Sequence, residues 1–91
     1  MKHTPKNLPY HELIGLRVRI VTHSDPSLVG RYGTVVWETA KTLIIKEPSG
    51  REITVLKHDG VFEFELPSGE HVVVEGLRIL GRPDNRVKKL K

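Results

Sequence analysis

The feature that most constrains the fold is a series of short β-type segments between residues 16 and 80, separated by turn residues at close spacing. In the clearest segment, Phe62, Phe64 and Leu66 alternate with Glu63 and Glu65. In a strand, this alternation puts the apolar side chains on one face and the carboxylates on the other. Short strands without intervening long helices are typical of a small barrel or sandwich and argue against a βαβ fold.

Six or seven strands are expected. In the first, Leu16, Val18 and Ile20 alternate with Arg17 and Arg19, which predicts an apolar face and a cationic face. Five further strands are predicted at 32–39, 42–46, 51–56, 61–66 and 70–75, with a short seventh segment at 77–80. A flat sheet of this kind would expose long edges, so we expect an all-β, strongly bent antiparallel sheet that nearly closes into a barrel.

Length and composition restrict the class of protein. A chain of 91 residues is expected to form one domain. It contains no cysteine, which excludes disulfides, a thiolate nucleophile and a Cys-ligated zinc site. No apolar run is long enough for a membrane span and the first residues lead into no signal-peptide core, so we expect a cytoplasmic protein without membrane contact.

The net charge of +4 is distributed unevenly. Residues 1–7 carry a net charge of +2, residues 8–81 carry −2, and residues 82–91 carry +4. Cationic ends of this kind commonly bind a polyanion, because each neutralised phosphate releases condensed counterions. A tail that only improves solubility is the alternative.

No residue pattern indicates an active site, a metal site or a cofactor. The five histidines show no HxH or HExxH spacing, and no glycine-rich loop has the Lys and Ser or Thr that cradle a phosphate. Glu63 and Glu65 resemble a catalytic carboxylate pair, but a solvated face or cross-strand pairing with Arg17 and Arg19 explains them better.

Nucleic-acid binding is the function that the charges favour. Arg17, Arg19, Arg31 and the tail from Arg82 could form one cationic surface if the barrel brings them together. Aromatic side chains are few, so recognition of the backbone and shape of a structured RNA fits better than base stacking, and Trp37 is more readily a rim or protein contact. The alternative is a protein-interaction module without RNA contact; an autonomous hydrolase is third.

Both ends have weak helical signals. Pro9–Ile14 can form one or two helical turns that stop at Gly15, and the tail after Pro83 has Asp84 near its start and lysines near its end. Segments this short need the barrel or a partner to hold them.

Residues at both ends and in the strands between form a specific combination. They are His11–Leu16 followed by Arg17, Val18 and Arg19; Pro26–Gly30 followed by Gly33, Val35, Val36, Glu38, Thr39, Thr42 and Leu43; Val61, Phe62 and Phe64; and Gly81, Arg82 and Pro83 followed by Arg86, Lys88 and Lys89. This combination resembles archaeal ribonuclease P protein component 1, the family of the 29-kilodalton eukaryotic subunit, over about residues 10 to 90. The departures are Trp37, where an acidic residue is usual, and Ala40 and Lys41 in the following turn.

The resemblance implies an Sm-like barrel over residues 16–81, with an N-terminal extension of residues 1–15 and a basic C-terminal extension of residues 82–91. It implies a subunit of the ribonucleoprotein that removes the 5′ leader from precursor tRNA. In that enzyme RNA supplies the active site, so the resemblance implies that this protein is not catalytic alone. The implied partners are the ribonuclease P RNA and a small zinc-ribbon protein subunit, with precursor tRNA as the substrate of the complex.

Site residues follow from the resemblance together with the charge pattern. Phosphate contacts are expected from basic residues of the first strand, the next loop and the tail. These are Arg17, Arg19, Arg31, Arg82, Arg86, Lys88 and Lys89. Partner contacts are expected at the first motif, which consists of His11, Glu12, Leu13 and Ile14.

Overall fold

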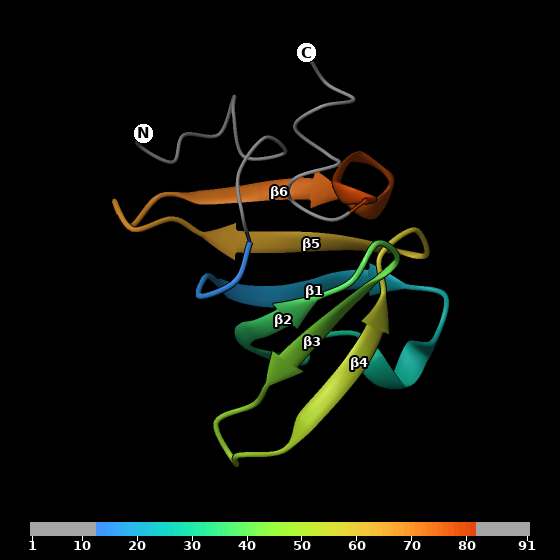
Figure 1. The fold of residues 1–91 in the computed structure, drawn as a ribbon, viewed down its shortest axis with the longest axis horizontal. Helices are drawn as coiled ribbons and strands as arrows, with labels where there is room; N and C mark the ends of the chain where they lie inside the picture. The colour runs from blue at the N-terminus through green and yellow to red at the C-terminus, as the bar shows by residue number, and fades with distance from the viewer. Residues whose placement is uncertain (1–12, 82–91) are drawn as a thin grey trace.

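The computed structural model describes residues 13–81, and over this range the chain is all-β, as predicted (Figure 1). Its elements are β1 (Arg17–His23), β2 (Tyr32–Glu38), β3 (Thr42–Lys46), β4 (Glu52–Leu56), β5 (Gly60–Glu65) and β6 (His71–Glu75), with the short 3-10 helices η2 (Pro26–Leu28) and η3 (Gly76–Ile79). Six of the predicted strands are therefore confirmed, with boundaries that differ by at most three residues.

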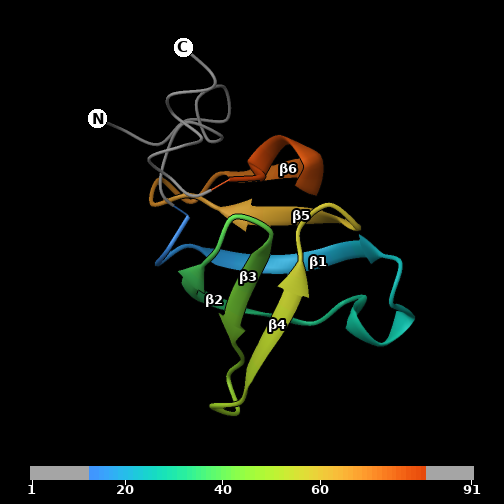
Figure 2. The same cartoon turned by 45° about the vertical axis from the view of Figure 1, so that its right-hand side comes forward.

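The strands form one sheet in the order β4-β3-β2-β1-β5-β6, and all neighbours are antiparallel. Figures 1 and 2 show β3 and β4 crossing β1 and β5 at a steep angle, so the sheet is strongly bent. Gly33 permits this bend, because a Cβ atom at that position would clash with the Lys46 carbonyl and the Ile45 side chain. A β-bulge between Val35 and Trp37 adds further local twist.

The predicted near closure into a barrel is not confirmed for the described part of the chain. No ladder joins β4 to β6, so both are edge strands of an open sheet, and a closed Sm-like barrel is not confirmed. The segment 77–80, expected as a seventh strand, lies mostly in η3. Gly76, at the start of η3, packs so tightly on the Lys57 carbonyl that a Cβ atom would clash. A helical turn, rather than a strand, therefore packs against Lys57, the residue that follows β4.

The alternation in the sequence correctly predicted which faces are buried. On β1, Val18 and Ile20 are buried while Arg17 and Arg19 point outward, and Phe62 and Phe64 of β5 are fully buried. One apolar cluster fills the inside of the bend. It consists of Leu13, Leu16, Val18, Ile20, Val35, Leu43, Ile45, Ile53, Val55, Phe62, Phe64, Leu66, Val74 and Ile79. At about 25 cal/mol per Å² of apolar area removed from water, this cluster is the main force that holds the bent sheet together.

Two turns are built as their sequences predict. The segments 48–50 and 67–69 share the sequence Pro-Ser-Gly, and Gly50 and Gly69 adopt φ values of 92° and 91° that other residues rarely reach. The amides of these glycines donate to the carbonyls of Glu47 and Leu66, both at 2.8 Å. The turns fix the register of β3 with β4 and of β5 with β6.

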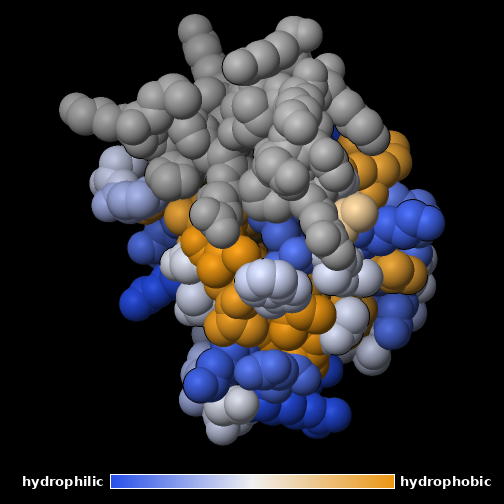
Figure 3. All heavy atoms as spheres, viewed as in Figure 1, coloured by the Kyte–Doolittle hydropathy of each residue, from blue (hydrophilic) through white to orange (hydrophobic). Residues whose placement is uncertain are grey.

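The molecular surface is mixed in character. On the face seen in Figure 3, hydrophobic side chains gather near the middle, with hydrophilic side chains around them. Trp37 is one of the exposed apolar side chains, with 60% of its surface accessible. Within residues 13–81, no helix is long and apolar enough to cross a membrane.

Candidate nucleic-acid interface

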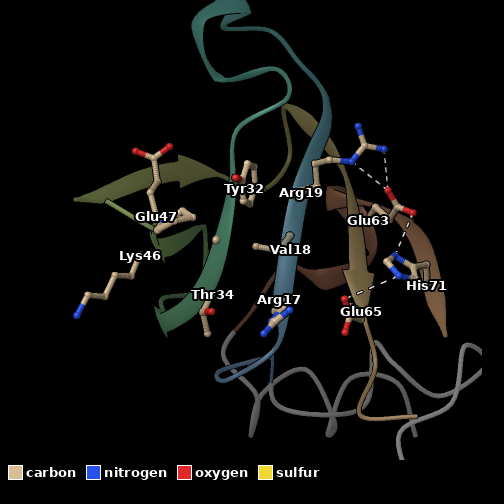
Figure 4. A pocket seen from close by; sticks show the side chains of 12 residues that line it. Arg17, Val18, Arg19, Tyr32, Thr34, Lys46, Glu47, Glu63, Glu65 and His71 are labelled. Carbon is tan, nitrogen blue, oxygen red and sulfur yellow. Dashed lines mark hydrogen bonds and ion pairs between the residues drawn. The ribbon is translucent and has the colours of Figure 1, made fainter. Parts of the chain in front are cut away.

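A groove of about 590 Å³ lies on the outward face of the sheet, on the opposite side from the apolar core. Its polar lining comes from neighbouring strands that are far apart in sequence (Figure 4). Arg17 and Arg19 of β1 run along its middle, with residues of β2 and β3 on one side and residues of β5 and β6 on the other. A groove of this size can accommodate a segment of an extended ligand.

One row of side chains crosses the sheet in register from β6 to β3 and ends at Glu52 of β4, which lies beside Lys46. Cα pairing places His71 beside Glu65, Glu65 beside Arg17, Arg17 beside Thr34, and Thr34 beside Lys46. Two strand spacings of about 4.8 Å separate Arg17 from Lys46, so their backbones lie about 10 Å apart with the Thr34 hydroxyl between them. This spacing suits contacts to neighbouring groups along a polyanionic backbone.

Arg17 and Lys46 are the available cations of the groove. Among the described residues neither forms an ion pair within 4 Å, although Glu65 is the register partner of Arg17 and Glu52 is that of Lys46. Both residues are exposed. An unpaired guanidinium and an unpaired ammonium beside a hydroxyl can bind phosphate oxygens without first breaking an internal ion pair.

Arg19 and Arg31 are held by carboxylates. Arg19 Nη2 donates to Glu63 Oε1 at 2.7 Å, which confirms the expected pairing between β1 and β5. Arg31 forms a two-bond pair with Glu47, with both donor–acceptor distances at 2.9 Å. The Arg19 hydrogen bond is the main cause that lowers the pKa of Glu63. These two arginines are therefore oriented, and their charges are largely compensated.

Tyr32 is the aromatic side chain of the groove. It pairs in register with Arg19 and exposes 58% of its surface. An exposed ring between cationic side chains can stack on a nucleobase, whereas Phe62 and Phe64 lie in the core as predicted. Trp37 does not line the groove.

The histidines of the described segments form no metal site. No group of three or more possible ligands gathers in residues 13–81. His71 Nδ1 lies 3.4 Å from Glu63 and its Nε2 lies 3.8 Å from Glu65, while His58 contacts the adjacent Asp59 at 3.0 Å. These contacts are surface ion pairs or turn contacts of ordinary kind.

A buried ion pair anchors both ends of the described chain. Lys57 Nζ donates to Glu38 Oε1 at 2.9 Å and to the Gly81 carbonyl at 3.0 Å, while the Leu13 amide donates to Glu38 Oε2 at 3.2 Å. Both ion-pair side chains are fully buried. The Glu38–Lys57 pair therefore holds both Leu13 and Gly81 in place by hydrogen bonds.

Sequence reasoning located part of this arrangement. It identified Arg17, Arg19 and Arg31, but it missed Lys46, whose outward position follows from the alternation of β3, and it missed the buried pair. Leu13, expected as a partner contact, is fully buried in the core. Ile14, also expected as a partner contact, is partly buried and packs against the same core. Six predicted site residues lie outside the described residues: His11, Glu12, Arg82, Arg86, Lys88 and Lys89.

Comparison with known proteins identifies close relatives. A family model described as ribonuclease P/MRP, subunit p29, matches residues 6–89. Ribonuclease P protein component 1 of Staphylothermus marinus is 53% identical over 90 residues, which cover 99% of this chain and 98% of the relative. The same component of Methanothermobacter thermautotrophicus is 48% identical over 86 residues, with 94% and 92% of the chains covered. A solved structure of Mth11, described as a homologue of the human RNase P protein Rpp29, aligns with a TM-score of 0.62 and 47% identity, covering 84% of this chain and 97% of that one.

Proposed function

Because the chain belongs to the ribonuclease P/MRP subunit p29 family, we propose that it is an RNA-binding subunit of ribonuclease P. The complex removes the 5′ leader from precursor tRNA in the cytoplasm, and its RNA carries out the cleavage. This chain binds and shapes that RNA together with a small zinc-ribbon subunit.

The observation that supports RNA contact by the sheet is the pair of available cations in the groove. Arg17 and Lys46 flank Thr34 in register and have no ion-pair partner among the described residues. Tyr32 adds a stacking surface next to Arg19. We assign phosphate contacts to Arg17 and Lys46, and oriented hydrogen bonds to the remaining donors of Arg19 and Arg31.

The extensions supply the second part of the proposed interface. Residues 1–15 and 82–91 are proposed as extensions on either side of the sheet domain of residues 16–81. Arg82, Arg86, Lys88 and Lys89 are proposed phosphate contacts because they concentrate positive charge in the last ten residues. His11, Glu12 and Ile14 are proposed to contact the protein partner, whereas Leu13 supports them from the core.

Salt-dependent binding tests the role of the groove. The full chain is titrated against the in vitro transcribed ribonuclease P RNA at several salt concentrations. Arg17→Ala/Lys46→Ala should weaken binding and reduce the slope of log affinity against log salt by about two, because each lost phosphate contact removes about one released counterion. Lys41→Ala/Arg51→Ala removes the same charge from exposed turn positions outside the groove and is the matched control.

Two outcomes count against the proposal. Equal slopes for the groove variant and the control would remove the groove from the interface. If the wild-type chain showed no salt-dependent affinity for the RNA in the absence of a second protein, a protein-docking module would replace the RNA-binding role.

A further inference from the structure

The outer edge of β6 is an open template for strand pairing. β6 pairs with β5 through five consecutive residues without a bulge, from His71 beside Glu65 to Glu75 beside Val61. On its other side no strand of residues 13–81 adds to the sheet, and no backbone hydrogen bond is made there by the described chain. The unpaired backbone groups of an exposed edge strand can pair with a strand of another chain, unless features of the edge prevent this.

β6 lacks two features that commonly protect an edge strand, a proline and a lysine. Its sequence, His-Val-Val-Val-Glu, contains no proline or lysine and has high β propensity. The central Val73 exposes 60% of its surface. This edge is therefore suited to receive a further strand.

The sequence of β6 is complementary to itself. When two copies of the strand run antiparallel about a two-fold axis at Val73, His71 of each copy lies opposite Glu75 of the other. Val72 then lies opposite Val74 and Val73 opposite Val73, so neither face has an opposed pair of like charges. An axis at Val72 or Val74 would place His71 or Glu75 opposite a valine and lose both charge pairs.

We propose that β6 is an association surface for a second copy of this chain, which adds its own β6 in this register. His71 lies 3.4 Å from Glu63 and 3.8 Å from Glu65, and in the dimer it would also face Glu75 of the partner subunit. Glu63 also carries the Arg19 ion pair. The result is one continuous sheet across both copies.

The symmetry fixes how the two grooves are related. Antiparallel pairing about an axis perpendicular to the sheet leaves the outward faces of both copies on the same side. The two grooves with Arg17 and Lys46 would therefore face the same direction and could engage one RNA together. The joint binding of one RNA rests on the proposed function, whereas the association of two copies through β6 does not.

The contact is small. A five-residue strand pair buries much less than the roughly 1,200 Å² of a standard stable interface, so we expect a dissociation constant on the order of 0.1–1 mM for the free chain. Association would become significant when local concentration is high, for example when both copies are bound to one RNA.

Sedimentation velocity of the full chain without RNA tests the proposal over concentrations from about 10 µM to about 2 mM. The wild-type chain should shift from monomer to dimer over this range. Glu75→Lys should weaken dimerisation about fivefold, because both charge pairs are lost. His71→Lys should dimerise at least as well as the wild type, because the introduced ammonium would face the same carboxylates.

A charge swap and an edge control complete the experiment. His71→Glu/Glu75→Lys restores opposite charges across the axis and should recover dimerisation, with folding checked by thermal melting. Glu52→Lys makes the same charge change on β4, the other edge strand, and should dimerise like the wild type. A chain that stays monomeric at about 2 mM, or a Glu75→Lys variant that dimerises like the wild type, would overturn the proposal.

Discussion

Replacing Lys57 with methionine should lower the free energy of unfolding by about 3–5 kcal/mol. The Lys57 side chain is fully buried, and its ammonium donates to Glu38 at 2.9 Å, to the Thr39 carbonyl at 2.8 Å and to the Gly81 carbonyl at 3.0 Å. Methionine fills a similar volume but leaves the Glu38 carboxylate buried without its cation, with the Leu13 amide at 3.2 Å as a remaining donor. The loss of the Lys57 ammonium beside a buried carboxylate, rather than a cavity, lowers the stability.

The loss should be easy to measure in a chain of this size. Domains typically have about 0.05–0.15 kcal/mol of stability per residue, so 91 residues correspond to roughly 5–14 kcal/mol in total. Urea unfolding followed by circular dichroism measures the change directly, and Tm should fall by about 12–40 °C. Lys41→Met makes the same substitution at an exposed position and should stay within about 0.5 kcal/mol of the wild type.

A double-mutant cycle separates charge from packing. Lys57→Met combined with Glu38→Leu removes both charges, so its loss should be smaller than the sum of the two single losses by about 1–3 kcal/mol. Strictly additive losses, or a Lys57→Met variant as stable as the Lys41→Met control, would show that the pair does not stabilise the fold in this way.

Two further predictions concern the sheet and its outward face. Gly33→Ala should lower stability by about 1–3 kcal/mol in the same urea assay, because its Cβ atom would clash with the Lys46 carbonyl and the Ile45 side chain; an unchanged midpoint would contradict a tight approach there. The Arg19 hydrogen bond lowers the pKa of Glu63, so this carboxylate contributes stability above its ordinary pKa and that contribution is lost as pH falls through the lower folded value. Arg19→Ala should raise the pKa of Glu63 in an NMR titration and weaken this acid dependence, whereas an unchanged titration would exclude Arg19 as the cause.

Local patterns predicted the strands and their faces well. The alternation of apolar and charged residues in β1 and β5 is set by the two-residue period of a strand, and the structure places these side chains on the expected sides. The Pro-Ser-Gly turns are also local signals. The all-β class and the six strands follow from such short-range rules.

Features that depend on distant residues were not predictable in the same way. Glu38 and Lys57 are 19 residues apart, and charged side chains in a sequence normally indicate an exposed surface, so nothing local marks them as a buried pair. The expected seventh strand was wrong for a local reason, because the 3-10 helix η3 follows β6 at that place. A segment of four residues does not by itself distinguish a strand from a helical turn.

Glu63 and Glu47 limit the contacts that Arg19 and Arg31 could make with RNA. Arg19 uses two of its five N–H donors on Glu63, and Arg31 uses two on Glu47, so three donors on each guanidinium remain in a fixed orientation. An arginine that is already held by a carboxylate loses little side-chain entropy when it binds a phosphate. Because its charge is largely compensated, however, the electrostatic gain from that contact is small. Contacts from these arginines should therefore add orientation without adding much salt dependence. Arg19→Lys should then weaken RNA binding while the salt slope stays close to that of the wild type, and a slope lowered by about one would show that Arg19 acts as a free cation instead.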